Sequence, residues 1–352
     1  MLLHGQDLDR RELRRRAGST AAAGGVRAVV LDDGSERGVR VLEFRTAAGL
    51  RFEVLIDRAF DIGAAEFDGC SIGWQSPTGV VDPRFADTDD DALMPLRGMN
   101  GLLVTGGLDH IMSAQTVDAS QYRYPARPTV RHPIHGRIAR IPARLIGYGQ
   151  DWTDTGCVLW AEAEIVQAAV FGEHLVLHRR YEVDLDGSDI RMTDRVVNRG
   201  FDPTPHMFLY HVNVGWPLVD EGSRLDAAVA RTLWETDSVR EQGLDHRVLS
   251  APVPGALEQV YEHELRPDAD GRVRAGIVND RLGLSFHVDV DPAQLPCFFQ
   301  WLHLREGAYA VGLEPATHHA AGDQAARDDG AMIWLGDGEE RRYSTVLRFG
   351  HG

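Results

Sequence analysis

From residue 25 to the C-terminus, apolar and polar residues alternate with a period of two, and helical periodicity is rare. This alternation is typical of strands with one buried face, because successive side chains of a strand point to opposite sides. Two hairpins are especially clear: residues 38–57 reverse at Ala47-Ala48-Gly49, and residues 174–200 reverse at Asp186-Gly187-Ser188. The pattern therefore predicts an all-β protein, a sandwich or a barrel, in place of a parallel sheet flanked by helices.

The domain organisation follows from the same pattern. No change of composition and no Ser/Gly linker divides the chain, so we expect one β domain over residues 25–352, preceded by an arm over residues 1–24. We expect the arm to form a short amphipathic helix that packs on the body or on a second copy in a homodimer. Residues 76–98 and 110–132 are long and irregular, which is typical of segments that wall a functional site. The arm is rich in arginine, with Arg10, Arg11, Arg14, Arg15 and Arg16.

Charge and composition exclude several classes of function. Acidic residues number 53 against 37 basic ones, and a net charge of −16 disfavours binding to a nucleic-acid backbone. Every basic residue is arginine, and the absence of lysine excludes Schiff-base chemistry and a Walker A loop. Three scattered cysteines predict neither a disulfide framework nor a thiolate zinc site. Without a secretory signal or an apolar run that spans a membrane, we expect a cytoplasmic protein with no membrane partner.

Two glycine patterns resemble motifs without their structural context. Gly69-Cys70-Ser71-Ile72-Gly73 matches the nucleophile elbow, but the following residues cannot open the helix that this motif requires. We interpret it as a tight turn between two strands. Gly147-Tyr148-Gly149 lacks the third glycine of a dinucleotide loop and is also predicted to be a turn. His132 lies in a proline-bounded loop, where a turn role is favoured over a ligand role.

Histidines and one glutamate remain as candidates for chemistry. His211 lies in a strand that is apolar on both faces, and it shares one face with Leu209 and Asn213. A buried histidine needs hydrogen bonds, whether its role is structural or functional. Glu314 ends an apolar strand just before Pro315, where desolvation raises the pKa of a carboxyl toward the range of a general base. The alternative is a rim carboxylate paired with an arginine.

Two further histidines adjoin glycines. His135 precedes a glycine, which allows a close backbone approach, and Arg137 supplies a donor fork nearby. His110 closes the run GLLVTGGLDH, in which Gly106 and Gly107 leave room for a ligand.

Four elements in order resemble one known family. They are DRAFDI at 57–62, GLLVTGGLD at 101–109, IHGR at 134–137 and the late pair of HMFLYHVN and GLEPATHH. Together they resemble the aldose-epimerase-like branch of the galactose mutarotase-like (aldose 1-epimerase) superfamily, over nearly the whole chain after residue 25. The sequence departs from the family at Tyr210-His211-Val212-Asn213, where the family has N-H-x-Y-F-N-L, and at H-G-R, where it has H-G-G. The resemblance implies a β-supersandwich that binds a sugar.

The resemblance also implies residue roles. His211 is expected to be the general acid and Glu314 the general base of a mutarotase that opens the sugar ring and interconverts its anomers. This chemistry needs no metal and no other cofactor. A tryptophan, Trp74, Trp216 or Trp301, is expected to stack on the sugar ring. The predicted sugar contacts are Arg58, Arg97, Asp109, His110, His135 and Asn213.

Two other functions remain open from the sequence. One is a different sugar isomerase, epimerase or lyase on the same fold, assisted by a metal at a site formed by His110, His135, His211 and Glu314. The other is a non-catalytic carbohydrate-binding protein, which needs the aromatic residues but no acid–base pair.

Overall fold

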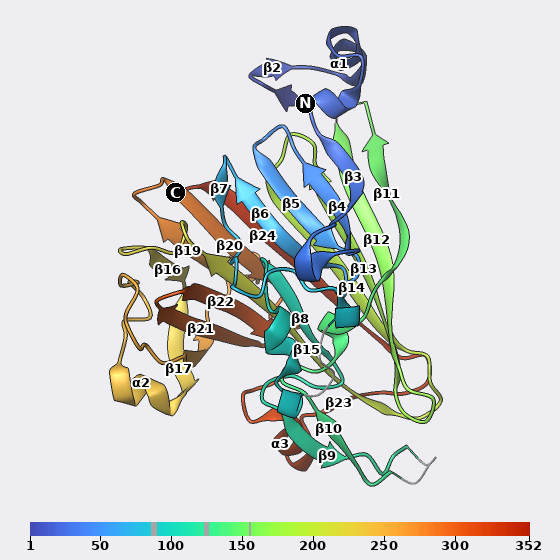
Figure 1. The fold of residues 1–352 in the computed structure, drawn as a ribbon, viewed down its shortest axis with the longest axis vertical. Coiled ribbons are helices and arrows are strands. Elements are labelled where there is room, and N and C mark those ends of the chain that lie inside the picture. The colour runs from blue at the N-terminus through green and yellow to red at the C-terminus, as the bar shows by residue number, and fades with distance from the viewer. Residues whose placement is uncertain (86–89, 123–126, 155) are drawn as a thin grey trace.

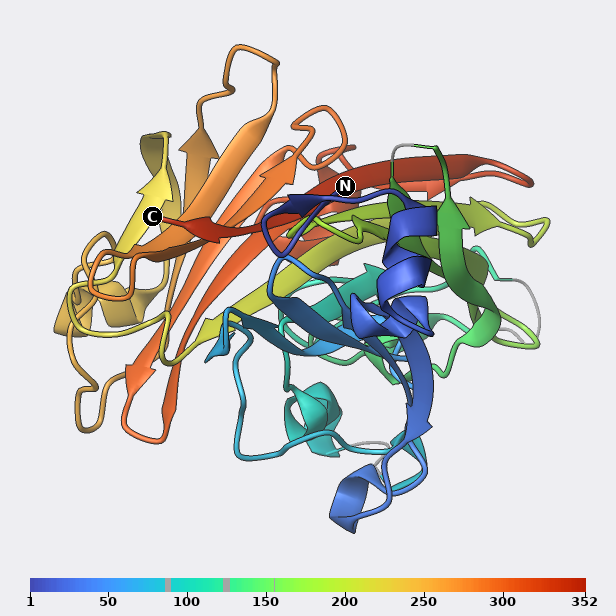
Figure 2. The ribbon, with the colours of Figure 1, turned by 90° about the horizontal axis from the view of Figure 1, so that it is seen from above.

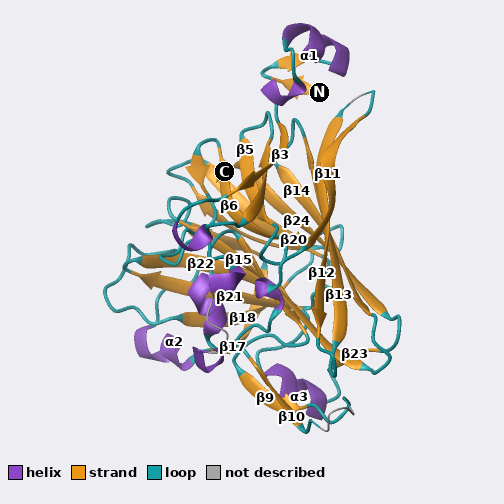
Figure 3. Cartoon of the chain, turned by 45° about the vertical axis from the view of Figure 1, so that its right-hand side comes forward, coloured by secondary structure: helices purple, strands orange, loops and turns teal. Residues whose placement is uncertain are grey.

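The computed structural model describes residues 1–85, 90–122, 127–154 and 156–352, and the chain is built mainly from strands (Figure 1). Each ladder between two strands of this part is antiparallel, and the few helices are short and peripheral (Figure 3). The all-β prediction is therefore confirmed. The irregular segments at 76–98 and 110–132 lie partly outside the described residues.

Three sheets form the body. Sheet I has the strand order β11 (Arg144–Trp152), β12 (Cys157–Ala168), β13 (His174–Asp184), β14 (Asp189–Asn198), β24 (Glu340–His351), β20 (Leu284–Val290), β19 (Val273–Asn279) and β16 (Arg224–Ala227). Sheet II has the order β17 (Val229–Glu235), β18 (Gln259–Leu265), β21 (Cys297–Arg305), β22 (Ala308–Ala316) and β15 (Thr204–Gly215), with β8 (Leu103–Leu108) and β23 (Ile333–Leu335) also paired to β15. Sheet III has the order β3 (Gly25–Val30), β4 (Arg40–Arg45), β5 (Leu50–Leu55), β6 (Asp61–Phe67) and β7 (Cys70–Ser71).

Shorter elements lie at the ends of the body. Two hairpins pair β1 (Leu2–Leu3) with β2 (Gln6–Asp7) and β9 (Gln115–Asp118) with β10 (Thr129–His132). The α-helices are α1 (Arg10–Arg16), α2 (Asp237–Gln242) and α3 (Gly322–Asp328). The 3-10 helices are η1 (Thr20–Ala22), η2 (Gly34–Glu36), η3 (Pro83–Phe85), η4 (Asp90–Ala92), η5 (Met94–Gly98) and η6 (Ile138–Arg140). No helix in the described residues is both long and apolar enough to cross a membrane.

A buried arginine ties the three sheets together. Arg179 on β13 of sheet I donates to Asp194 on β14 at 2.7–3.2 Å, to Asp61 on β6 of sheet III at 2.8 Å, and to Thr105 on β8 of sheet II at 2.9 Å. Tyr210 on β15 donates its hydroxyl to Asp194 at 2.7 Å. All five side chains are buried, so their charges and polar groups are satisfied by one another. Sheet III, blue in Figure 2, thereby packs against sheet I with β8 and β15 alongside.

Most of the predicted turns are confirmed. The two hairpins are β4–β5 and β13–β14, and Gly69, with φ of +79°, forms the predicted tight turn between β6 and β7. The prediction of a turn at Gly147-Tyr148-Gly149 is wrong, because these residues lie inside β11. A Cβ at Gly147 would come within 3.1 Å of the Trp160 ring, so the glycine makes room for an indole on the neighbouring strand.

The N-terminal arm contains the expected short helix. Asp9 caps α1 by accepting from the Glu12 amide at 2.7 Å, and Leu13 is buried against the body. Arg10 lies over the ring of Trp152 on β11 at 5.3 Å. The arm therefore contacts the top of sheet I in Figure 1, while the domain boundary at residue 24 and the homodimer stay predictions.

Candidate functional site

Strands β15 and β22 bring His211 and Glu314 together. Their ladder pairs Val212 with Leu313 and Asn213 with Gly312, which carries His211 opposite Glu314 on the same face of sheet II. His211 Nε2 lies 3.1 Å from Glu314 Oε1, and the two side chains are only 4–5% exposed. Residues separated by about a hundred positions in the sequence thus form one buried acid–base pair.

Gly312 makes this contact possible. A Cβ at this position would lie 2.5 Å from Glu314 Oε1, 2.9 Å from Trp301 Cβ and 3.2 Å from His211 Cε1. Separations under 3.0 Å are not tolerated, so any side chain here displaces the carboxyl group or the indole.

We expect Gly312→Ala to abolish most of whatever catalysis depends on the pair while leaving the sheet intact, because its backbone conformation is open to alanine and the conflict is with side chains. The matched control is Gly350→Ala on β24, where a Cβ would meet Ser285 Oγ at an ordinary 3.5 Å. Activity and circular dichroism would be measured for both variants. Unchanged activity in Gly312→Ala would contradict a role for the tight His211–Glu314 contact.

Aromatic rings surround the pair. The Trp301 ring lies edge-on to His211 with 5.4 Å between centroids, and Trp74 lies 5.5 Å from Trp301. Trp301 is nearly buried and Trp74 is half-buried, whereas Trp216 is 66% exposed. Of the three predicted tryptophans, Trp301 therefore contacts His211 of the pair, and Trp74 packs against Trp301.

His135 reaches the same place from a loop. Its ring lies 5.3 Å from that of His211 in an edge-on arrangement. Gly136 follows with φ of +77°, and a Cβ there would lie 2.3 Å from the Gly107 carbonyl oxygen. The backbone of His135 accepts from Gly107 N at 2.9 Å and donates to Met112 O at 2.8 Å. The close backbone approach predicted from the His-Gly pair is present.

Burial sets the protonation of the pair. Desolvation, with the nearby His135 adding to it, lowers the pKa of His211 well below 6.5. Desolvation, with Glu258 adding to it, raises the pKa of Glu314 well above 4.5. The site therefore favours a neutral imidazole beside a protonated carboxyl. In this state the carboxyl carries a proton that it can donate, and the imidazole is able to accept one.

Several polar atoms at the pair have no hydrogen-bond partner within the described ranges. His211 and Glu314 approach closely but without hydrogen-bond geometry, and the amide nitrogen of Asn213 donates to Gly101 O at 3.4 Å. The unpartnered atoms are His135 Nδ1, His211 Nδ1, Asn213 Oδ1 and Glu314 Oε1. Because buried polar groups are nearly always satisfied, this concentration is a mark of a binding site for a polar ligand.

The structure directs other predicted sugar contacts elsewhere. Arg58 is buried and donates to the main-chain oxygens of Asn100 at 2.5 Å and Leu103 at 3.0 Å, so it braces the backbone that precedes β8. Arg97 lies exposed on η5. Of the six predicted contacts, the structure brings His135 and Asn213 to the pair.

Asp109 and His110 belong to a second polar cluster. The ring of His110 stacks on His132 with 4.7 Å between centroids and 7° between planes. Asp109 accepts from Gln167 Nε2 at 2.7 Å, and its other oxygen lies 3.5 Å from Arg137 Nη1. His132 ends strand β10, so the prediction of a turn role for it is wrong. Burial lowers its pKa to about 4.

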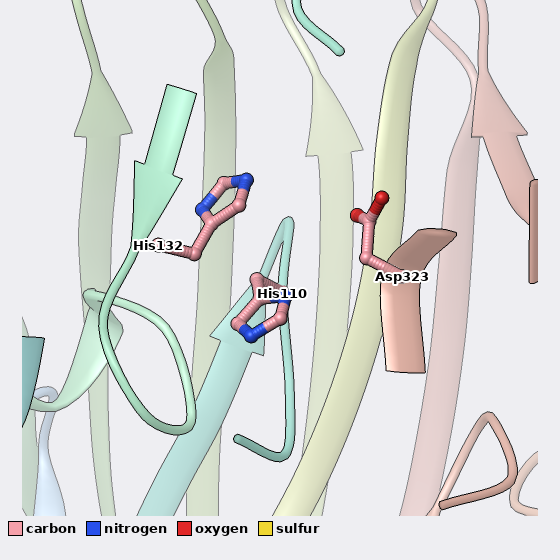
Figure 4. Close-up of side chains that lie close together, drawn as sticks. All are labelled: His110, His132 and Asp323. Carbon is pink, nitrogen blue, oxygen red and sulfur yellow. The ribbon is translucent and has the colours of Figure 1, made fainter. Parts of the chain in front are cut away.

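Sequence reasoning missed two members of the polar clusters. His132 stands three residues before His135, and this spacing was the signal that could have found it. Asp323 in α3 had no signal, because a lone aspartate at a helix start is usually a cap. Among the described residues, two groups have ligand atoms close enough together for one metal ion: His110, His132 and Asp323 (Figure 4), and Glu262, Cys297 and His319.

The arrangement of the three sheets is that of the galactose mutarotase-like fold, as comparison with solved structures shows. A structure from Klebsiella pneumoniae, provisionally named an aldose 1-epimerase, is 20% identical, with a TM-score of 0.81 over 93% of this chain and 83% of that one. A galactose mutarotase-like protein from Clostridium acetobutylicum is 14% identical, with a TM-score of 0.64 over 94% and 100%. A GalM/aldose epimerase homologue from C. elegans is 10% identical, with a TM-score of 0.55 over 94% and 99%.

The sequence itself places the chain in a family. Residues 36–349 match the family described as "Domain of unknown function (DUF4432)", and the chain belongs to it. No curated protein matches the sequence.

Proposed function

We propose that the protein is an isomerase of the aldose 1-epimerase type, which interconverts the anomers of a sugar or sugar derivative by general acid–base catalysis. The observation that carries the proposal is the 3.1 Å approach of His211 Nε2 to Glu314 Oε1 in a buried, aromatic-lined place. The names of the structural neighbours from Klebsiella pneumoniae and Clostridium acetobutylicum point to the same class.

The geometry suits the atoms that must react. In a cyclic sugar the anomeric hydroxyl and the ring oxygen are bonded to the same carbon, so an acid and a base that act on them must lie side by side. One member of the pair removes the hydroxyl proton while the other delivers a proton to the ring oxygen, and the bond from C1 to the ring oxygen breaks. After the aldehyde rotates, the reverse transfers close the ring on the other face and restore the pair.

The roles implied by the resemblance, His211 as acid and Glu314 as base, require the ionised form of the pair. Burial favours the neutral form, with the proton on Glu314. The two forms contain the same number of protons and differ only in which of the two neighbouring groups carries one of them. We therefore assign the chemistry to the pair as a unit that carries one transferable proton.

The sugar would be held by the unpartnered atoms and the rings. His135 Nδ1 and Asn213 Oδ1 are buried and free to bond sugar hydroxyls. Trp301 and the half-buried Trp74 offer apolar surface for the ring face. The metal-assisted alternative needs His110 beside the pair, but His110 stacks on His132 instead, so we do not retain that four-residue site.

The pH profile of turnover should show an acidic limb, a plateau and an alkaline limb. The one-proton state is lost at low pH when His211 gains a second proton, and at high pH when Glu314 loses its proton. Because desolvation lowers the pKa of His211 well below its usual value and raises that of Glu314 well above its usual value, we assign the acidic limb to His211 and the alkaline limb to Glu314. The turnover number, corrected for spontaneous mutarotation, would be measured over the acid to mildly alkaline range. A narrow bell between pH 4.5 and 6.5 would contradict this assignment.

The direct test is exchange NMR with purified protein on a panel of reducing sugars that includes sugar acids and 6-substituted sugars. Enzyme-dependent exchange between the two anomeric proton signals of at least one sugar is the expected result. Binding without exchange on every sugar of the panel would instead support a carbohydrate-binding protein. If the protein neither binds any sugar of the panel nor exchanges its anomers, the proposal is overturned for these substrates.

A further inference from the structure

We propose that His110, His132 and Asp323 form a binding site for one divalent transition-metal ion such as Zn²⁺, distinct from the His211–Glu314 pair. The three side chains come from the segment after β8, from the end of β10 and from α3, and they converge in Figure 4. One potential ligand atom from each lies within 4.8 Å of those from the other two. All three side chains are buried.

Each residue has one unused atom. His110 Nδ1, His132 Nε2 and Asp323 Oδ2 have no hydrogen-bond partner in the part of the chain that the structure describes. A buried polar atom without a partner costs free energy, and three such atoms from three separate segments call for a common partner. A metal ion accepts electron pairs from all three at once.

The other atoms of two of these residues are held in the manner of metal ligands. His110 Nε2 lies 2.8 Å from Ser113 O, so this nitrogen carries the proton and donates it, and Nδ1 keeps its lone pair. Metal-bound histidines are almost always oriented by a hydrogen bond from the other ring nitrogen to a carboxylate, a backbone carbonyl or water. Asp323 Oδ1 accepts from Arg327 Nε, which leaves Oδ2 for the ion.

Binding requires a small rearrangement of the site. With bonds of about 2.1 Å to zinc, two ligand atoms are at most about 4.2 Å apart, so any separation between that value and the present limit of 4.8 Å must shrink. His132 Nδ1 now accepts from Arg137 Nη1 at 3.0 Å. When Nε2 binds an ion, Nδ1 carries the proton, and Asp109 Oδ2 at 3.8 Å is the nearby acceptor. Arg137 then has to move aside.

The donor set selects the type of ion. Two imidazoles and one carboxylate are typical of Zn²⁺ and Fe²⁺ sites, whereas Ca²⁺ and Mg²⁺ prefer oxygen ligands. The ion would join α3 and β10 to the segment after β8, which contains His110 and Met112. His135 lies three residues after His132 and is bonded to Met112 in that segment, so the ion would brace the loop that carries His135.

The test compares metal uptake by the full chain and by variants. Protein treated with a chelator is dialysed against Zn²⁺, and in parallel against Mn²⁺ and anaerobic Fe²⁺, and the bound metal and the thermal midpoint are measured. Wild type should retain one equivalent of metal. Its thermal midpoint should rise by about 5 °C when the concentration of free metal is a hundredfold above the dissociation constant. His132→Gln and Asp323→Asn should each lose the bound ion and the gain, with circular dichroism confirming that each variant is folded.

The matched control is His319→Gln, which disrupts the other candidate group, Glu262, Cys297 and His319. It should retain the ion and the gain. Loss of the ion in His319→Gln with retention in folded Asp323→Asn would overturn the proposal, as would failure of wild type to retain any of the three metals. Neither readout involves a sugar, so the result is independent of the proposed isomerase activity.

Discussion

Glu314→Gln should lower enzyme-dependent anomer exchange by about a hundredfold to ten-thousandfold, the usual contribution of a general acid–base group. Glutamine keeps the size of the side chain but neither releases nor takes up a proton, so only His211 of the pair is left to exchange protons with the sugar. Exchange NMR on the sugar that wild type handles best would measure the loss. Sugar affinity should change little, because His135 and Asn213 remain.

The double variant with His211→Asn sharpens this prediction. Because the two residues act as one unit, the double variant should lose far less than the product of the two single losses. Glu262→Gln is the matched control: Glu262 is a buried carboxylate on the same sheet, and it contacts His319 instead of His211. If Glu314→Gln keeps nearly full exchange, Glu314 is a structural carboxylate, and the mutarotase proposal has to be abandoned.

Arg179→Met should destabilise the protein by about 3–5 kcal/mol, because it leaves two buried carboxylates, Asp61 and Asp194, without their countercharge. Denaturant unfolding followed by tryptophan fluorescence would measure the change. Arg231→Met, which breaks the exposed pair with Glu264 on sheet II, is the control and should leave the unfolding midpoint nearly unchanged.

A further variant tests the cause of that loss. Replacing Asp194 by Leu in the Arg179→Met background removes one stranded charge and should recover part of the stability, although the Tyr210 hydroxyl then loses its acceptor. If Arg179→Met is as stable as wild type, the three sheets do not depend on this arginine, and apolar packing alone holds β8 and β15 in place.

The fold class was predictable because the period of two is a local property. Alternation in 38–57 and 174–200 requires strands wherever they pair, and the turn residues between them mark the hairpins. The glycines at 147 and 149 were misread because a glycine in a strand and a glycine in a turn look alike without the neighbouring Trp160. The turn role predicted for His132 was wrong for a similar reason, since His110, on which its ring stacks, follows a different strand of the sequence.

Sequence alone determined that His211 and Asn213 share one face of a doubly buried strand, because side chains alternate along any strand. It also determined that Glu314 is desolvated, since an apolar strand leads to it. Only the tertiary structure decided that the two residues meet, because the register between β15 and β22 depends on how all three sheets pack. The same packing turned Arg58 toward main-chain oxygens and His110 toward His132, since each buried polar group bonds whatever partner the finished fold brings within reach.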